Sequence, residues 1–176
     1  MSDIKNKIIN GIIKREGGYV DDSRDSGGKT CYGITEKVAR EHGFVGHMSD
    51  LPKKKAFDIY ASEYWHSVRA DDLEKVSGQI AEEVVDTAVN MGPTTAGVFL
   101  QRSLNALTEN ELVIDGMIGN KTIKALNDYI VRREDDKVIL KALNCLQGSA
   151  YIELTERRKK DKAFIYGWLM HRIALD

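Results

Sequence analysis

Apolar side chains recur at helical spacing along most of this chain, and only two prolines interrupt its 176 residues. The isoleucines of residues 4–13 recur at three- or four-residue intervals and therefore line one face of a helix. Gly17 and Gly18 follow, and glycine readily adopts the left-handed conformation that ends a helix. The spacing predicts a mainly α fold that begins with an amphipathic helix.

The same periodicity predicts further helices. They cover residues 36–42, a segment after Pro52, and residues 79–91, 95–107 and 120–131. A last long helix is expected after Asp135, a candidate cap, with an interruption near Gly148 or Gly167. Residues 19–35, by contrast, are rich in Gly, Asp and Ser and contain β-prone pieces such as residues 29–34. We expect a loop or small β-hairpin there, and long irregular loops in compact domains commonly carry function.

Composition and charge exclude several classes of protein. Hydrophobic residues make up 42% of the chain and charged residues 30%, which is typical of a folded protein. The net charge of −1 provides no general attraction to nucleic acid, so no nucleic-acid partner is expected. Cys31 and Cys145 are too few for a disulfide scaffold or a thiolate zinc site, and the four histidines lack the HExxH spacing of zinc peptidases. We therefore expect no metal and no cofactor.

The N-terminal residues alternate Lys and Arg with isoleucine and lack the uninterrupted apolar core of a signal peptide. No apolar stretch is long enough to span a bilayer. We therefore expect a protein that is made in the cytosol without a signal peptide and without an integral membrane segment.

A pair of carboxylates near the first helix can support acid–base chemistry. Glu16 ends the apolar helix, and Asp25 lies in the loop that follows it. A carboxylic acid at a helix end, partly shielded by apolar neighbours, can protonate a leaving oxygen, while a second carboxylate and the hydroxyl of Thr30 handle water. From the pattern alone, a solvated helix end and turn-forming aspartates are the commoner explanation.

Three motifs in this region resemble the signature of glycoside hydrolase family 108, which contains phage lysozymes and bacterial secretion activators. They read EGGY at residues 16–19, DSGGKT at residues 25–30 and YGIT at residues 32–35. The resemblance implies a lysozyme-like α+β fold with Glu16 as the general acid. Asp25 and Thr30 match the carboxylate-and-threonine part of the phage lysozyme triad by order and approximate spacing. Tyr32, in the third motif, is expected to bind substrate.

The second half of the chain resembles the peptidoglycan-binding segment of the same family. The matching stretches are DTAVNMGP at residues 86–93, Leu100-Gln101, DGMIG at residues 115–119 and FIYGW at residues 164–168, with Arg172. The implied organisation is a catalytic lobe over residues 1–92 and a helical wall-binding lobe over residues 93–176, packed as one globular unit. Gly92-Pro93 is the expected boundary.

Two side chains in the first of these stretches are candidates for sugar binding. Asp86 and Asn90 are four residues apart and share a helix face, so both can hydrogen-bond sugar amides. Equally, Asn90 can simply help to end the helix before Gly92. Tyr60, Tyr64 and Trp65 can stack on sugar rings, although an aromatic stripe at helical spacing more often belongs to a hydrophobic core.

The C-terminal segment is basic. Residues 157–176 contain six Lys or Arg and two Asp, a local charge of +4. This segment can attract anionic wall or membrane polymers through a screened, salt-dependent force, or it can be an ordinary solvated helix face.

The resemblance implies hydrolysis of the β-1,4 bond between N-acetylmuramic acid and N-acetylglucosamine in peptidoglycan glycan strands. It indicates a monomeric phage endolysin or prophage relative, made in the host cytoplasm and acting on the cell wall in the periplasm. A phage holin would provide access without direct contact. Two alternatives stay open: a lytic transglycosylase acting on the same bond, and a non-catalytic peptidoglycan-binding protein that assists secretion.

Overall fold

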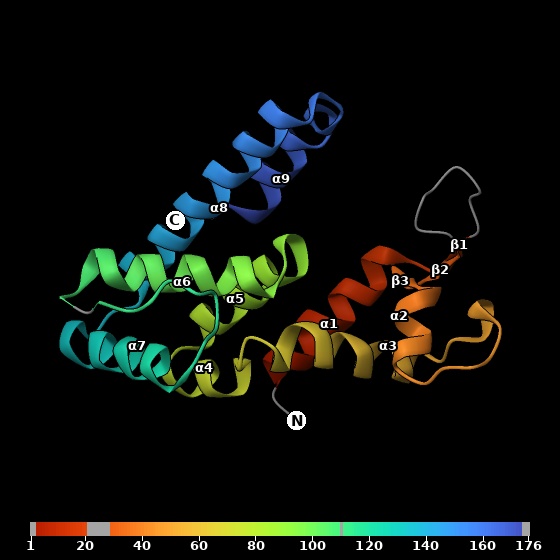
Figure 1. Ribbon diagram of the computed structural model, residues 1–176, viewed down its shortest axis with the longest axis horizontal. Coiled ribbons are helices and arrows are strands. Elements are labelled where there is room, and N and C mark those ends of the chain that lie inside the picture. The colour runs from red at the N-terminus through yellow and green to blue at the C-terminus, as the bar shows by residue number, and fades with distance from the viewer. Residues whose placement is uncertain (1–2, 21–28, 110, 174–176) are drawn as a thin grey trace. The chain divides into compact units, whose positions relative to one another are not determined.

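The computed structural model describes residues 3–20, 29–109 and 111–173 of the chain, which is mainly α-helical with one small β-sheet (Figure 1). Its contacts divide the chain into two compact units, Met1–Ser67 and Val68–Asp176. Within the described residues, no helix combines the length and apolarity needed to cross a bilayer. The mainly α class with a small β element after the first helix, predicted from the sequence, is confirmed.

The first unit is built on one amphipathic helix. Its elements are α1 (Asp3–Glu16), β1 (Tyr19–Val20), β2 (Thr30–Cys31), β3 (Ile34–Thr35), α2 (Glu36–Glu41), the 3₁₀ turn η1 (Met48–Asp50), α3 (Lys53–Tyr60) and its π-helical continuation η2 (Ala61–His66). The isoleucine face of α1 packs against α3 and η2, with Ile9, Ile12 and Ile13 buried. Trp65 of η2 is fully buried, so this member of the aromatic stripe belongs to the core.

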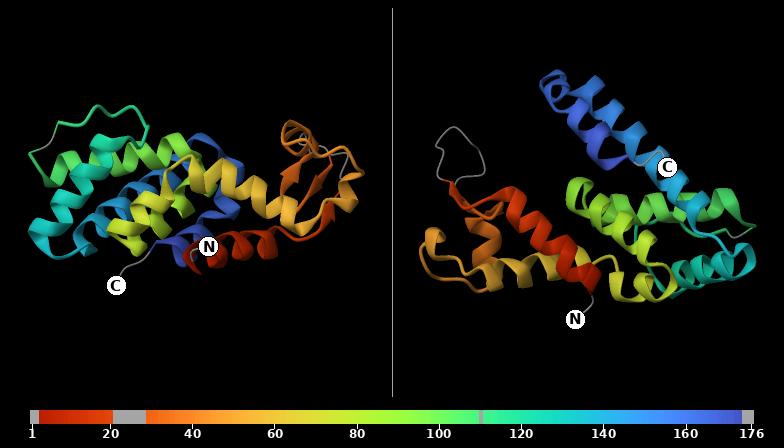
Figure 2. Two further views of the ribbon diagram at one scale, coloured as in Figure 1. Left: turned by 90° about the horizontal axis from the view of Figure 1, so that it is seen from below. Right: turned by 180° about the vertical axis from the view of Figure 1, so that it is seen from behind.

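The β-sheet is a short antiparallel meander in the order β1-β2-β3 that directly follows the carboxyl end of α1 (Figure 2, left). The pairing of Cys31 with Ile34 leaves a two-residue turn, Tyr32–Gly33. Both turn residues have positive φ, 53° and 74°, as a tight hairpin of this length requires. Thr35 then ends β3 and begins α2, because its side chain accepts a hydrogen bond from the backbone N–H of Val38.

The second unit consists of helices alone. They are α4 (Ala70–Val76), α5 (Gly78–Met91), α6 (Pro93–Leu107), α7 (Asn120–Arg133), α8 (Lys137–Arg157), the 3₁₀ segment η3 (Lys159–Ala163) and α9 (Ile165–Arg172). Helix α5 packs against α4, α6 and α8, which makes it the centre of this unit. Gly92, at φ 91°, ends α5, and Pro93 begins α6. The two helices that flank Gly92-Pro93 therefore pack together within one compact unit.

The last long helix differs from its prediction. Helix α8 passes through Gly148 without interruption, and the break comes at Arg158. Gly148 is tolerated because it faces the buried side of α8, where the packing of the unit holds the helix. Gly167 lies inside α9. The residue at the N-cap of α8 is Asp136, not the predicted Asp135; Asp135, one residue earlier, accepts the backbone N–H of Lys137 at 3.0 Å.

The loop between α6 and α7 is fixed to α6 by one buried side chain. The amide nitrogen of Gln101 donates to Asp115 Oδ1 (2.8 Å) and to the carbonyl of Met117 (3.1 Å), and its oxygen accepts the backbone N–H of Gly116 (2.9 Å). Gly97 of α6 lets this loop approach closely, because a Cβ on Gly97 would lie 2.0 Å from the carbonyl oxygen of Gly116. No larger residue fits at residue 97 without moving the backbone.

We therefore expect Gly97→Ala to lower the free energy of unfolding by about 1–3 kcal/mol, as overpacking against an unyielding neighbour does. Gly148→Ala is the matched control, because its Cβ would meet the Ile173 side chain at an ordinary 3.7 Å. Alanine within a helix is favoured over glycine by about 0.5–1 kcal/mol, so this variant should be as stable as the parent or more so. Urea denaturation measures both, and equal losses would contradict the close approach of Gly97.

Candidate active site

Glu16, the predicted general acid, is the last residue of α1, and its carboxyl lies against the turn between β2 and β3. A Cβ on Gly33 would lie 2.9 Å from both Cγ and Oε2 of Glu16. Glycine is thus required at residue 33 for two reasons: its φ of 74° and the space that the Glu16 side chain occupies. The turn forms one wall of the site, while Glu16 remains exposed to solvent on the other side.

Tyr60 of α3 fixes this turn in place. Its hydroxyl donates to the backbone carbonyl of Tyr32 at 2.9 Å and also lies 2.9 Å from the position that a Gly33 Cβ would take. Burial, reinforced by the negative charge of Glu16, raises the pKa of Tyr60 well above its ordinary value, so its phenol stays protonated and remains a donor. The carboxyl of Glu16, the turn and this phenol therefore meet at one point.

Tyr64 extends the aromatic wall beside Glu16. Its ring stacks on that of Tyr60 with centroids 5.7 Å apart and an interplanar angle of 29°. Burial raises the pKa of Tyr64, and the negative charges of Glu63 and Glu16 act in the same direction. Tyr64 is only partly buried, in contrast to Tyr60 and Trp65. The aromatic stripe thus combines core residues with a partly accessible ring near the candidate acid.

The structure places some, but not all, of the other site residues predicted in the first unit near Glu16. Thr30 lies in β2, three residues before Gly33, and pairs across the sheet with Val20 and Thr35. Tyr32 shapes the turn through its backbone, with its carbonyl held by Tyr60. Asp25 lies outside the described residues. The structure therefore brings the Tyr32–Gly33 turn to Glu16, whereas the roles of Asp25 and Thr30 stay predictions.

Asp86 and Asn90 lie in the second unit, on α5, where they bind each other. The side-chain amide of Asn90 donates to the backbone carbonyl of Asp86 at 2.7 Å and to its carboxylate at 2.8 Å. This pair is internal to the last turns of α5, as expected for a residue that helps to end the helix. Sugar binding by these two side chains stays a prediction.

A buried carboxyl on the same helix was not singled out from the sequence. Burial, with the negative charges of Asp86 and Glu82, raises the pKa of Glu83 from 4.5 to about 7, although a hydrogen bond from Asn144 opposes the shift. Its Oε1 is buried without a hydrogen-bond partner. The sequence did contain a signal, because Glu83 is three residues after the buried Ile80 and therefore on the inward face of α5.

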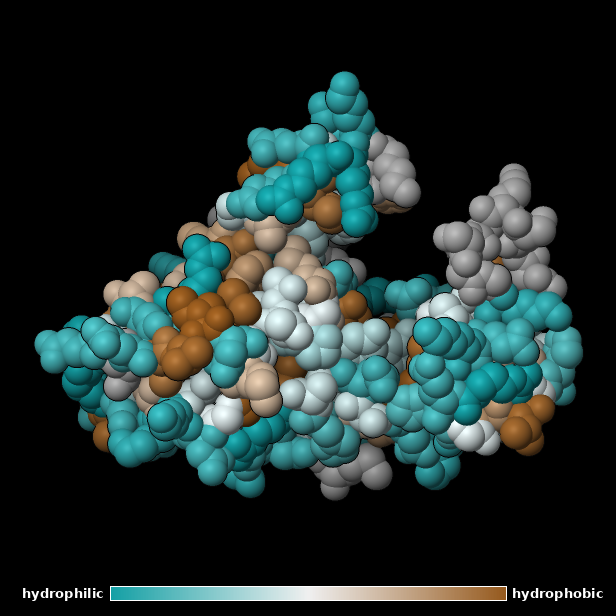
Figure 3. Space-filling model, in the orientation of Figure 1, coloured by the Kyte–Doolittle hydropathy of each residue, from teal (hydrophilic) through white to brown (hydrophobic). Residues whose placement is uncertain are grey.

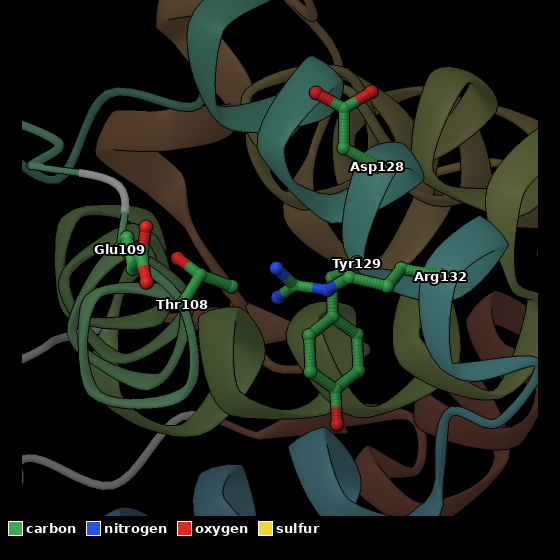
Figure 4. A pocket seen from close by; sticks show the side chains of 5 residues that line it. All are labelled: Thr108, Glu109, Asp128, Tyr129 and Arg132. Carbon is green, nitrogen blue, oxygen red and sulfur yellow. The ribbon is translucent and has the colours of Figure 1, made fainter.

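The second unit also has a polar pocket of about 300 Å³ between the carboxyl end of α6 and α7 (Figure 4). Its lining residues are Thr108, Glu109, Asp128, Tyr129 and Arg132. One neighbouring hollow shares Tyr129 with it and another shares Asp128, so the three lie next to one another along α7; together they are called the groove along α7 below. The groove carries charges of both signs.

Comparisons with known proteins divide the chain at a different place from its compact units. Residues 9–92 match the family described as glycosyl hydrolase 108, and residues 95–173 match a family described as a predicted peptidoglycan domain. The matched hydrolase segment therefore extends through α5, into the second compact unit. Glu16, Thr30 and Tyr60 lie in the hydrolase segment, and the groove along α7 lies in the peptidoglycan segment.

Among solved structures, SagA of Brucella abortus is similar to this chain, with a TM-score of 0.68 and 28% sequence identity. The similarity covers 93% of this chain and 86% of that one. No curated protein matches the chain significantly in sequence.

Together these matches define a glycosyl hydrolase that acts on peptidoglycan. The resemblance to glycoside hydrolase family 108 that the motifs indicated is confirmed for residues 9–92, and a peptidoglycan-binding segment follows it.

Tyr60→Phe tests how the turn beside Glu16 is held. Loss of the hydroxyl leaves the partly buried Tyr32 carbonyl without this donor, and we expect the free energy of unfolding to fall by about 1 kcal/mol. Hydrolysis of purified cell walls should fall several-fold as the turn loosens around Glu16. Tyr64→Phe is the control, because its hydroxyl takes no part in the bond to Tyr32. Equal effects of both substitutions would show that this bond does not position the site.

Glu83 predicts a pH dependence of stability. Its pKa is higher in the folded chain than in the unfolded one, so the folded state binds more protons between about pH 4.5 and pH 7. The free energy of unfolding should therefore fall as the pH rises through this window, by roughly 3 kcal/mol for a shift of this size. Glu83→Gln should remove that component, whereas the exposed Glu156→Gln should not. Urea denaturation at pH 5 and pH 8 compares the variants, and identical pH slopes would contradict the burial of Glu83.

Proposed function

We propose that this chain is a muramidase of the lysozyme type, which hydrolyses the β-1,4 bond between N-acetylmuramic acid and N-acetylglucosamine. The observation that carries the proposal is the position of Glu16, whose solvent-exposed side chain lies against the Tyr32–Gly33 turn that the phenol of Tyr60 holds. A general acid must be open to substrate and lie beside a fixed wall of the site, and this arrangement provides both.

In the proposed reaction, Glu16 donates its proton to the glycosidic oxygen as the C–O bond breaks, so the leaving sugar departs as an alcohol. Positive charge develops on the ring that remains, and water attacks its anomeric carbon. Asp25 accepts a proton from that water, and the hydroxyl of Thr30 orients it. Tyr32 and Tyr64, beside Glu16, are the residues that we expect to contact the sugar rings.

We assign wall binding to residues 93–176 and catalysis to residues 1–92. The groove along α7 supports the first assignment, because a peptidoglycan strand bears both carboxylates and amides. Arg132 can pair with a carboxylate, and Asp128 can accept a hydrogen bond from an amide N–H. Asp86 and Asn90, at the end of α5, are proposed as further polar contacts. In this view the protein is an endolysin that functions as a monomer and reaches the wall of its host once a holin has opened the inner membrane.

The alternatives make different products. A lytic transglycosylase would use the same acid, but a sugar hydroxyl would replace water and leave an anhydro sugar that is lighter by one water. A secretion-assisting binder would leave the wall intact. The exposed approach to Glu16 favours an enzyme that admits water.

Glu16→Gln is the central test. The amide preserves the side-chain volume but cannot donate the proton. We therefore expect the rate of wall hydrolysis to fall at least 100-fold, within the range of about 10²–10⁴ for general-acid catalysis. The melting temperature should not change, since the side chain is exposed. Glu41→Gln on α2, also exposed, is the control and should keep full activity.

Zymography on purified walls and mass spectrometry of the released muropeptides are the measurements. A folded Glu16→Gln variant that still clears walls at the parental rate would refute the assignment. Anhydro products from the parent would show that the protein is a lytic transglycosylase and not a hydrolase.

A further inference from the structure

Helix α9 leaves an apolar face in water. Tyr166, Leu169 and Met170 follow one another at three- and four-residue spacing on this helix, so they share one face. Their exposed fractions are 77%, 37% and 65%, and Phe164, just before the helix, is 58% exposed. Single exposed apolar residues are common, but three on one helix face mark an interaction surface.

The packing of α9 explains why this face points outward. Trp168 stacks on Tyr151 of α8, with ring centroids 5.1 Å apart, and on Phe164 at 6.1 Å. Helix α9 lies beside the end of α8 in each view (Figures 1 and 2). Because Trp168 attaches α9 to α8, the helix cannot turn its Tyr166 face inward without breaking that stack.

Exposed cations precede the apolar face in the chain. The connection between α8 and α9 exposes Arg157, Arg158, Lys159 and Lys162. Residues 152–172 together contain six Lys or Arg against three Asp or Glu, a local charge of +3 in a chain whose net charge is −1. In the space-filling view, hydrophobic residues appear between hydrophilic ones over the ends of α8 and α9 (Figure 3). The surface is therefore both cationic and apolar.

These two properties together select the partner. A glycan strand can stack on Tyr166 and Phe164, but it gains nothing from the aliphatic side chains of Leu169 and Met170. Hydrocarbon favours all four, and anionic headgroups attract the neighbouring cations. We propose that this α9 face, made of Tyr166, Leu169 and Met170, binds the surface of an anionic phospholipid membrane together with the exposed Phe164 and the four cations that precede it. This activity is separate from wall hydrolysis and does not depend on it.

Vesicle co-sedimentation of the full chain tests the proposal. Vesicles of phosphatidylglycerol and phosphatidylethanolamine should bind at least ten-fold more tightly than vesicles of phosphatidylcholine, and added salt should weaken the binding. Tyr166→Ser combined with Met170→Ser should reduce binding at least ten-fold at low and high salt. Arg158→Gln combined with Lys159→Gln should reduce it mainly at low salt.

Val131→Ser is the matched control, because Val131 is 69% exposed on α7 of the same unit. This variant should bind vesicles like the parent, and all of these variants should keep the parental melting temperature. Glu16→Gln should bind vesicles normally, so a failure of the proposed muramidase activity would leave this result unaffected.

Three outcomes would overturn the proposal. The first is equal binding to anionic and zwitterionic vesicles, or none to either. The second is parental binding by the Tyr166→Ser, Met170→Ser variant. The third is a concentration-dependent dimer that the same variant abolishes, which would assign the α9 face to a second copy of the chain.

Discussion

The hydrogen bond from Tyr60 to the carbonyl of Tyr32 joins a core helix to the turn that lies against the candidate acid, Glu16. The residues it joins are 28 positions apart in the sequence. Through this bond the turn sits so close to Glu16 that only glycine fits at residue 33. Glu16 itself is positioned by α1, because the buried isoleucine face of this helix fixes the place of the helix end in the unit. Site geometry in this unit therefore depends on core packing and on one buried phenol.

The second unit solves a similar problem with different residues. Gln101 of α6 holds the α6–α7 loop through three hydrogen bonds, and Gly97 allows the backbones to approach. In both units a buried polar side chain forms hydrogen bonds with the backbone of a loop or turn. In both, a glycine allows a close approach that a larger side chain would prevent. The polar groove along α7 is next to this fixed loop, so a rigid support lies beneath the proposed wall-binding surface.

Charge is distributed unevenly over the molecule, and this bears on how it would work. A chain of net charge −1 has no general attraction to anionic polymers, yet residues 152–172 carry +3 beside an apolar helix face. On α5, burial raises the pKa of Glu83 to about 7. An enzyme of the cell wall works among anionic glycans and close to membranes, where such local features decide binding more than the net charge does.

Local sequence patterns predicted most of the helices, the small sheet after the first of them and the signature around Glu16, because periodicity and short motifs are local properties. Only the tertiary structure showed that Tyr60 is both a core residue and the anchor of the turn. It also showed that the Oε1 atom of Glu83 is buried and that α8 continues through Gly148. Likewise, α5 and α6 pack together across Gly92-Pro93, so the compact units divide at Ser67 although the residues there show no breaker pattern. The physical reason is the same in each case: the energy of these features comes from partners distant in the sequence, which no local pattern encodes.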